Sequence, residues 1–577
     1  MALSEVDQSV ALNSRHPAAA RAKAEATDRP AVGVRHLMDF LVCLALWVIV
    51  VRGFGIEGYI ISTGSMAPHL LGYHKRVVCP SCQKVFAVGV PPGSSPSELR
   101  RATCPNCGQR WIDISKVPIN AGDQLLVHKN AYTFRPPRRW DMVVFRNPEQ
   151  PTQAYVKRVV GLPGERVQIV AGDVVINGHV QRKNLIQQRA TRILVYDDTY
   201  RPAAASDWQP RWNPDSGWRA VSGGFETRPE GRRSGRTGAA TFRWLSYRHW
   251  VRSGGVHPTA VTVRPWPAEV VAAADALAFG GPSHAAGEID ATAQQIRCRG
   301  VLTRSARRWF LSLSDAPHWR RAVEQLERES HLAPITDAYA YDGPAGQTGV
   351  NLVRDLMIAA QVTVHSGQGQ LVFRMLDGRH VYDAVLGFQS GMLRVFVDGK
   401  ERAVAERRLP AIAFDRPWLV EMSTFDRQIV FAIDGREVLS YVPDDTEAAT
   451  ADGALETAPT YRNPRFALSR PVHIAAKGLA VRIERLRLYR DVYYTAGESR
   501  RAVDRPYQLG PDQYFFLGDN SPVSLDSRSW SNARVTRQMF VGKPLVLHLP
   551  SRPAKIRIGR YVGHIRIPDF TRIRYIR

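Results

Sequence analysis

The chain has 577 residues, of which 44% are hydrophobic and 13 are tryptophan, so it is long enough for roughly two to four packed domains and is not a generally disordered polypeptide. Its formal net charge is +25, from 78 Lys and Arg against 53 Asp and Glu, and such an excess attracts polyanions. No helix-turn-helix, RNP or basic-zipper signature occurs, so we expect anionic membrane lipid as a partner and no nucleic acid, unless the charge only reflects a generally arginine-rich composition.

An apolar segment follows a polar, alanine-rich tail, residues 1–36, which we expect to be flexible. Twelve apolar residues run from Phe40 to Val51, whereas a membrane span needs about 20 residues of helix. We therefore expect a transmembrane signal anchor over residues 37–56, with Arg52 reaching the lipid interface. A buried core helix is the alternative, and a cleaved signal peptide would need a small-residue cleavage site that is missing here. The anchor predicts a single-pass protein of the cell (inner or cytoplasmic) membrane with the remainder on the extracytoplasmic side.

A candidate nucleophile lies shortly after the anchor, in the segment ISTGSMAPHL, residues 61–70. Ser65 stands between a glycine and a Met-Ala-Pro turn, and Thr63 offers a second hydroxyl two residues earlier. A tether of fourteen residues after Val51 reaches at most about 50 Å, which keeps Ser65 near the bilayer. Taken alone, a serine in such a turn more often serves only the turn.

A candidate general base lies in a second segment, residues 155–178, whose β-branched runs, LPG turn and Asn177-Gly178 hairpin signal predict a β meander. Alternation along the strand points Lys157 and Arg158 to opposite sides, so one of them should be driven inward. Burial penalises the ammonium form, and a neutral lysine beside a serine can act as its base. The alternative is an edge-strand lysine in solvent.

A third segment, residues 515–530, begins as a strand that ends in Gly518, Asp519 and Asn520. Ser524, Asp526 and Arg528 follow at intervals of two residues. The carboxylate and guanidinium suit an ion pair that holds a loop, and the hydroxyl could hold the lysine amine in place.

In this order, the three segments resemble the boxes of the type I signal peptidases, peptidase family S26, which use a Ser/Lys dyad. Residues 121–148 resemble the strand pair of that family, and residues 541–550 resemble its closing strand. The resemblance implies a mainly β chain with a signal-peptidase-type β-barrel core, built here from residues 57–76, 112–185 and 506–577.

By the same resemblance, each candidate residue receives a role. Ser65 would be the nucleophile and Lys157 the general base, oriented by Ser524. Thr63, where many members have serine, would form the oxyanion hole with the Ser65 N–H. Structural support would come from Gly518, Asp519, Asn520, Asp526 and Arg528, and Ser521 stands where many members carry arginine.

The implied reaction is endopeptidase cleavage through an acyl-enzyme, without a catalytic cofactor. The implied substrates are secretory preproteins with small residues at the first and third positions before the cut. One alternative is a catalytically inactive, membrane-anchored binding protein built on this scaffold, but the retained serine and lysine argue against it. The other is a LexA-like self-cleaving repressor, which leaves the anchor unexplained and lacks a DNA-binding module.

Four of the six cysteines form two CxxC pairs separated by 21 residues, within an insertion at residues 77–111. Two such pairs suit a tetrahedral Zn²⁺ with four thiolates, so we expect a structural zinc ribbon. Outside a membrane the same thiols could instead oxidise to disulfides. The expected ligands are Cys79, Cys82, Cys104 and Cys107.

A much larger insertion separates the lysine segment from the Gly-Asp-Asn segment. Residues 186–334 are rich in Trp and Arg, and residues 335–505 show strand-like runs such as 356–364 and 369–376. Asp398-Gly399 and Asp434-Gly435 are typical of hairpin turns. We expect a jelly-roll sandwich of the laminin-G or concanavalin kind that binds a glycan or protein ligand, or else a packing module or lid over the protease.

Overall fold

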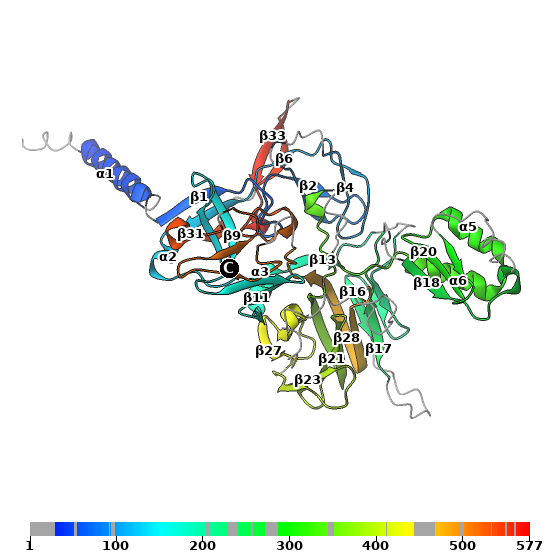
Figure 1. The fold of residues 1–577 in the computed structure, drawn as a ribbon. Helices are drawn as coiled ribbons and strands as arrows, with labels where there is room; N and C mark the ends of the chain where they lie inside the picture. The colour runs from blue at the N-terminus through cyan, green and yellow to red at the C-terminus, as the bar shows by residue number, and fades with distance from the viewer. Residues whose placement is uncertain are drawn as a thin grey trace, which may run out of the picture.

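The computed structural model is mainly β and shows a strand-rich body from which one helix projects (Figure 1). The structure describes residues 29–50, 53, 55–91, 93, 99–202, 208–227, 241–252, 254, 258–271, 287–343, 351–410, 412–443, 468–495, 501–531, 533–548, 551–558 and 561–576.

The catalytic candidates lie on a sheet assembled from both ends of the chain. Its strands are ordered β1-β7-β31-β8-β9-β30, and β34 adds to β31. Every neighbouring pair on this path is antiparallel. Three of these pairs join segments more than 350 residues apart in sequence. The strands are β1 (Ile56–Ile60), β7 (Gln124–His128), β8 (Met142–Arg146), β9 (Ala154–Gly161), β30 (Phe515–Leu517), β31 (Phe540–His548) and β34 (Arg574–Tyr575).

Strand β8 of this sheet is buried on both faces. Met142 and Val144 pack with Met66 of the serine segment, whereas Val143 and Phe145 pack in a separate cluster. That second cluster contains Phe516 and Trp530 of the Gly-Asp-Asn segment. Because apolar material covers both faces, polar side chains on the neighbouring strand β9 are enclosed whichever way they point.

A second, four-stranded sheet has the order β12-β11-β10-β29. Asn177 and Gly178 have φ angles of 51° and 87° and join β11 to β12, as the sequence predicts for a tight hairpin. Its strands are β10 (Arg166–Val170), β11 (Asp173–Ile176), β12 (His179–Val180) and β29 (Tyr507–Gln508).

The large insertion contains a 13-stranded β assembly around two long strands, β21 (Leu356–Leu376) and β28 (Val472–Arg490), which pair along their lengths. The runs expected as two strands, 356–364 and 369–376, form one continuous strand, because shifts of register near Gly367 absorb the extra residues between them. Asp434 and Gly435 turn the chain at φ 46° and 84°, as expected. Later strands of this assembly are β22 (Val381–Gly387), β23 (Met392–Val397), β24 (Ala405–Arg408), β25 (Trp418–Ser423), β26 (Ile429–Ile433) and β27 (Arg436–Tyr441).

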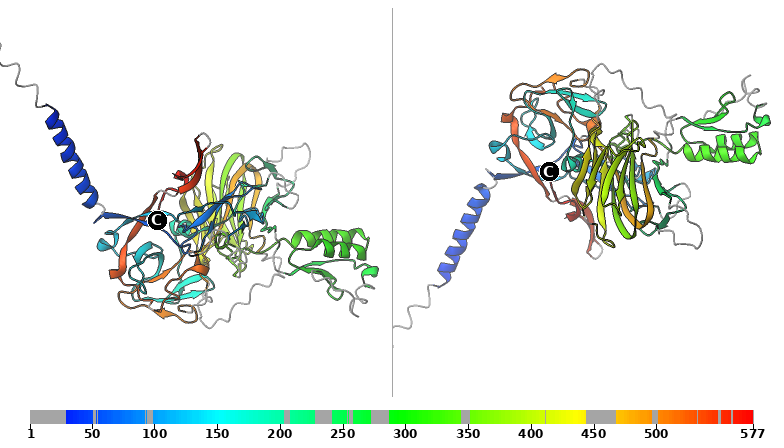
Figure 2. Two further views of the ribbon diagram at one scale, coloured as in Figure 1. Left: turned by 90° about the horizontal axis from the view of Figure 1, so that it is seen from above. Right: turned by 90° about the horizontal axis from the view of Figure 1, so that it is seen from below.

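The Trp- and Arg-rich stretch at 186–334, expected as the start of the large insertion, divides into two parts. The 13-stranded assembly is called the sandwich below. The first part of the stretch pairs with β28 and so belongs to the sandwich itself. The second part forms a three-stranded sheet covered by two helices, and this unit stands at the opposite side of the body from the N-terminal helix (Figures 1 and 2). The first part contains β13 (Ile193–Asp197), β14 (Trp212–Pro214), β15 (Arg219–Val221), β16 (Gly224–Thr227) and β17 (Arg243–Tyr247). The second contains β18 (Pro258–Thr262), β19 (Glu288–Asp290), β20 (Gln295–Arg299), α5 (Arg304–Leu313) and α6 (Pro317–Glu329).

The cysteine-containing insertion is a set of short strands. Strands β3, β2 and β6 form one sheet and β4 and β5 form another. A hairpin of β32 and β33 follows the core strands near the end of the chain. The short elements are β2 (His74–Val78), β3 (Val85–Gly89), β4 (Arg101–Ala102), β5 (Ile112–Asp113), β6 (Ile119–Asn120), β32 (Ser551–Ile558), β33 (Tyr561–Pro568), α2 (Ala131–Phe134) and α3 (Leu185–Thr191).

The projecting helix α1 (Arg29–Val50) carries the apolar run, and its side chains from Val34 to Val50 are all exposed. Within the described residues, no helix combines the length and the apolar character needed to cross a membrane. The transmembrane anchor expected at 37–56 is therefore not confirmed. Residues 1–28 of the expected tail and 51, 52 and 54 of the expected anchor lie outside the described residues.

Candidate active site

Ser65 lies in a turn that follows β1, and its backbone is held by Asn520. The Asn520 N–H donates to the Ser65 carbonyl (3.0 Å), and the Asn520 side-chain amide donates to the Gly64 carbonyl (3.1 Å). The Ala67 N–H closes the turn onto the Gly64 carbonyl at 3.0 Å. The Ser65 side chain is half-buried, and its own N–H donates to no acceptor within the described residues.

Lys157 of β9 meets this serine directly. Its Nζ lies 2.5 Å from Ser65 Oγ, although the two residues are 92 positions apart in sequence. Only 3% of Lys157 is exposed, and burial lowers the pKa of its amine to about 8. The negative charge of Asp526 opposes this shift, and the positive charge of Arg528 adds to it. With a pKa of about 8, roughly one amine in ten is uncharged at pH 7, and half of the amines are uncharged at pH 8.

Arg158, which follows Lys157, is also buried, so the expectation that only one of the two would face inward is wrong. The reason is that both faces of this sheet are covered. The Arg158 guanidinium donates two hydrogen bonds to the Asp519 carboxylate, at 2.7 and 2.6 Å. His69 Nδ1 lies 2.7 Å from the same carboxylate. Burial opposes ionisation of Asp519, but the charge and hydrogen bonds of Arg158 outweigh it and hold the pKa of this carboxyl far below its usual range.

Thr63 lies on the solvent side of the nucleophile. Its Oγ1 is 3.3 Å from Ser65 Oγ, and its side chain is exposed. The Thr63 hydroxyl is therefore close to the Ser65 Oγ atom.

Ser524 lies near the Ser65 backbone but forms no hydrogen bond with Lys157, which differs from the role that the resemblance implies. Its Oγ is buried and has no hydrogen-bond partner within the described residues. Gly518 separates the two serines, because a Cβ at this position would lie 2.1 Å from Ser524 Oγ and 2.6 Å from the Ser65 carbonyl oxygen. Only glycine allows the three segments to approach this closely.

The loop after Gly518 is held by the expected ion pair. Arg528 donates to both carboxylate oxygens of Asp526, at 2.8 and 2.7 Å, and the Gly518 N–H donates to the same carboxylate at 3.0 Å. Burial opposes ionisation of Asp526, but Arg528 outweighs it and lowers the pKa of that carboxyl. Arg528 also donates to the Ser521 hydroxyl at 2.7 Å, so Ser521 serves the packing of the loop.

Three residues near the pair were not identified from the sequence. Arg158 and His69 lie in the segments that carry Lys157 and Ser65. Their position in those segments could have indicated that they lie near the site. Asp342 lies in the large insertion and reaches the Asn520 amide at 2.6 Å. Its separation of 178 residues from Asn520 left no local pattern to find.

The four cysteines expected to bind metal do converge. All four are buried, their sulfur atoms lie within 4.8 Å of one another, and none is in a disulfide. The Cys79–Cys107 and Cys82–Cys104 sulfur separations are 3.6 and 3.7 Å. A tetrahedron with Zn–S bonds of about 2.3 Å has edges of about 3.8 Å, so the donor set and its spacing fit Zn²⁺.

A second group with metal-ligand chemistry consists of the carboxylates of Asp173, Asp355 and Asp426. The Lys183 ammonium lies against this group, paired with Asp426 and with Asp491. Burial raises the pKa of Asp355 well above its usual value and that of Asp426 to about 7. Carboxyls with raised pKa values are partly protonated and so carry less negative charge, and the Lys183 ammonium offsets part of the remainder. Both effects reduce the electrostatic repulsion among the carboxylates.

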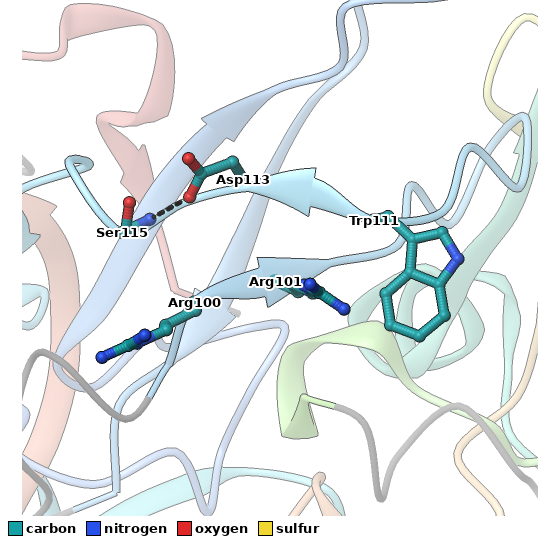
Figure 3. A pocket seen from close by; sticks show the side chains of 5 residues that line it. All are labelled: Arg100, Arg101, Trp111, Asp113 and Ser115. Atoms are coloured by element: carbon teal, nitrogen blue, oxygen red, sulfur yellow. Dashed lines mark hydrogen bonds between the residues drawn. The ribbon is translucent and has the colours of Figure 1, made fainter.

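Figure 3 shows a separate cavity of about 720 Å³ on the cysteine-containing insertion. Its lining includes the exposed Trp111, with the Arg101 guanidinium 4.8 Å from the centre of the ring, and Asp113, which accepts a hydrogen bond from the Ser115 N–H. Neither Ser65 nor Lys157 lines this cavity.

Comparison with known proteins identifies one segment of the chain. A family model described as "Signal peptidase, peptidase S26" matches residues 116–216, which include Lys157 but neither Ser65 nor Asp526. Signal peptidase I of Leptolyngbya laminosa is 45% identical over 76 residues, 12% of this chain and 37% of that protein. Signal peptidase I of Pseudomonas aeruginosa is 36% identical over 84 residues, 12% of this chain and 30% of that protein. The chain thus spans under two-fifths of the length of these relatives, and its residues 116–216 are similar to the signal peptidase S26 family.

Among solved structures, the carbohydrate binding module CBM66 from Bacillus subtilis aligns at 13% identity over 23% of this chain and 73% of that chain. The TM-score is 0.17, which is too low to carry an argument about the fold or ligand of the insertion.

Proposed function

We propose that this chain, with its signal peptidase S26 segment, is a serine endopeptidase that removes signal peptides from secretory preproteins. The observation that carries the proposal is the 2.5 Å approach of a buried amine with a pKa of about 8 to the Ser65 hydroxyl. A binding scaffold has no need of a serine and a lysine of lowered pKa held together in this way, which is why we favour an enzyme over an inactive binding protein.

The pair supports acyl transfer through two proton movements. Ser65 Oγ attacks the carbonyl carbon of the scissile bond while Lys157 takes the hydroxyl proton. The resulting ammonium gives that proton to the leaving amine nitrogen as the C–N bond breaks. Water then attacks the acyl-enzyme and loses a proton to Lys157, which passes that proton to Ser65 Oγ as the ester C–O bond breaks, so both the hydroxyl and the uncharged amine are restored.

Charge on the substrate carbonyl oxygen would be stabilised by two donors. The Ser65 N–H is unpaired among the described residues, and the Thr63 hydroxyl lies 3.3 Å from the nucleophile and can rotate toward a developing oxyanion. Small substrate side chains at the first and third positions before the cut complete this proposal, by analogy with the family.

We place the reaction at the extracytoplasmic face of the cell membrane. The support is helix α1, which exposes a continuous apolar surface that includes Phe40, Leu41 and Trp47. An exposed apolar helix on a chain of net charge +25 favours association with anionic lipid.

We also assign a structural zinc ion to the four cysteines. Each CxxC pair forms a tight turn, with Gln83 donating to the Cys79 carbonyl and Gly108 to the Cys104 carbonyl, at 3.0 and 2.9 Å. All four sulfur atoms face one point, which leaves no ligand position for a substrate. Catalysis requires no cofactor in this scheme.

The first test is cleavage of a secretory precursor, followed by mass spectrometry of the new N-terminus. Ser65→Ala and Lys157→Arg should each lower kcat by about 10³-fold or more, since the first removes the nucleophile and arginine does not lose its proton in a protein. Thr63→Val should lower kcat by about 100-fold through loss of an oxyanion donor.

Ser62→Ala is the matched control, because Ser62 is an exposed hydroxyl in the same turn, and this variant should cleave like the wild type. Normal turnover by Lys157→Arg would refute the dyad. A wild-type protein that leaves every precursor intact would favour the inactive binding protein.

The second test is the pH dependence of kcat/KM for a short peptide substrate between pH 6 and 10. Burial lowers the pKa of Lys157 to about 8, so the amine is protonated below that pH and uncharged above it. Only the uncharged amine accepts the serine proton, so activity should rise tenfold per pH unit below pH 8 and level off above it. A profile that is flat from pH 6 to 9, or that falls across this range, would contradict Lys157 as the base.

The third test is metal analysis of protein purified without chelator. We expect one zinc per chain in the wild type, and loss of zinc with a lower Tm in Cys79→Ser, because the tetrahedral site loses a ligand. Cys298→Ser is the control, since this buried cysteine lies outside the cluster and its replacement should leave the zinc content unchanged. Wild-type protein without zinc, or with masses showing two disulfides, would overturn the assignment.

The fourth test is flotation with vesicles of anionic and neutral phospholipid. The wild type should float with anionic vesicles, and the double variant Leu41→Lys/Leu44→Lys should remain in the dense fraction because its apolar surface is interrupted. Val442→Lys, at an exposed apolar residue of the sandwich, should float like the wild type. Equal flotation of all three proteins would exclude α1 as the membrane contact.

A further inference from the structure

One short segment of the large insertion touches the turn that carries the candidate nucleophile. This segment is the 3₁₀ turn η2 (Ala340–Asp342), whose Tyr341 is buried in a cluster with Ala67 and Leu71. A Cβ added to Gly64, the residue before Ser65, would lie 2.4 Å from Cε1 of the Tyr341 ring. The ring therefore lies directly over the backbone of the turn and limits where Gly64 can move.

The next residue, Asp342, is connected to the same turn through Asn520. The Asn520 Nδ2 group donates to Asp342 Oδ1 at 2.6 Å and to the Gly64 carbonyl at 3.1 Å, while the Asn520 N–H donates to the Ser65 carbonyl at 3.0 Å. Asn520 is buried, and its Oδ1 has no hydrogen-bond partner within the described residues. Asp342 thus supplies the acceptor that makes the amide present its NH₂ group, rather than its oxygen, to the serine turn.

The η2 segment itself rests on a rigid support. Asp337 and Asn351 are joined by three hydrogen bonds: the Asp337 carboxylate accepts from the Asn351 N–H and side-chain amide at 3.0 and 2.7 Å, and the Asp337 N–H donates to the Asn351 carbonyl at 3.0 Å. Arg490, at the buried end of the long strand β28, donates to the carbonyls of Asp337 and Ala338 at 3.0 and 3.4 Å. The sandwich therefore fixes the position of the contact made on the Ser65 turn.

We propose that Tyr341 and Asp342 are positioning residues for proteolysis, supplied to the Ser65 turn by the insertion. Tyr341 fixes the Gly64 backbone by packing, and Asp342 fixes the orientation of the Asn520 amide, which in turn holds the carbonyls of Gly64 and Ser65. In this proposal the insertion contributes to the geometry of the active site. This inference rests on the proposed endopeptidase function, since its effect is exerted through the geometry of Ser65.

A displacement of the nucleophile by about 1 Å can cost on the order of 100-fold in rate without removing any reacting group. Loss of either contact should therefore lower kcat while leaving KM nearly unchanged, because neither residue need touch the substrate. Asp342→Ala and Tyr341→Ala should each lower kcat by about 10- to 100-fold. Tyr341→Phe should retain activity, because the Tyr341 hydroxyl contributes only a long, 3.5 Å contact to the Tyr73 carbonyl.

Two further variants separate positioning from a general loss of stability. Asp415→Ala removes an exposed carboxylate of the same insertion that pairs with His365, and it should leave kcat unchanged. The double variant Asp342→Ala/Asn520→Ala should be no slower than Asn520→Ala alone, because both changes break one connection. If the double variant instead shows the product of the two single-variant rate losses, the two residues act independently and the Asp342–Asn520 connection is overturned.

Hydrogen exchange of the peptide covering residues 61–70 supplies a readout that does not depend on activity. Exchange should be faster in Asp342→Ala and Tyr341→Ala than in the wild type, and unchanged in Tyr341→Phe and Asp415→Ala. The inference would be overturned if the wild type is active and the Asp342→Ala and Tyr341→Ala variants have the same kcat and the same exchange rates as the wild type. An inactive wild type would refute the proposed function, and the exchange comparison would still decide whether η2 holds the turn.

Discussion

The site depends on burial that lowers the pKa of a lysine amine lying against a serine hydroxyl inside the protein. Burial alone favours the neutral amine, yet two carboxylates, Asp519 and Asp526, lie close enough to favour the ammonium. Each carboxylate is matched by its own arginine, Arg158 and Arg528 respectively. These two buried ion pairs keep the net negative potential at Lys157 small, so the lowered pKa of the amine survives beside two acids.

Covering this pair on all sides requires segments from the whole chain. The serine turn packs on one face of β8, and the loop of Asp526 and Trp530 packs on the other. The cysteine-containing insertion is in turn docked on the large insertion, where Asn106 bonds to the backbone of Asp197 and Tyr200. The same large insertion returns to the site through η2. The two insertions and the strands that carry Lys157 therefore form one connected structure in which the large insertion helps to hold the Ser65 turn.

The relatives aligned here share only a short part of the chain, and the family match ends before the sandwich is complete. What is specific to this protein therefore lies mostly in the inserted segments. A ribbon with four clustered cysteines near the serine turn and an aromatic contact from the large insertion would both stiffen a site of this kind.

The sequence by itself determined the chemistry-bearing residues that are local, because their information lies in short motifs. The Ser65 turn, the hairpin at Asn177-Gly178, the two CxxC pairs and the Asp526–Arg528 ion pair all follow from residue types at fixed spacing. The tertiary structure alone decided which long-range neighbours meet. It buried both Lys157 and Arg158 because both sheet faces are covered, left Ser524 without a hydrogen bond to Lys157, and joined two expected strands into β21. It also brought Asp342 to Asn520, because that contact depends on how a strand pair folds across 178 residues, which no local pattern records.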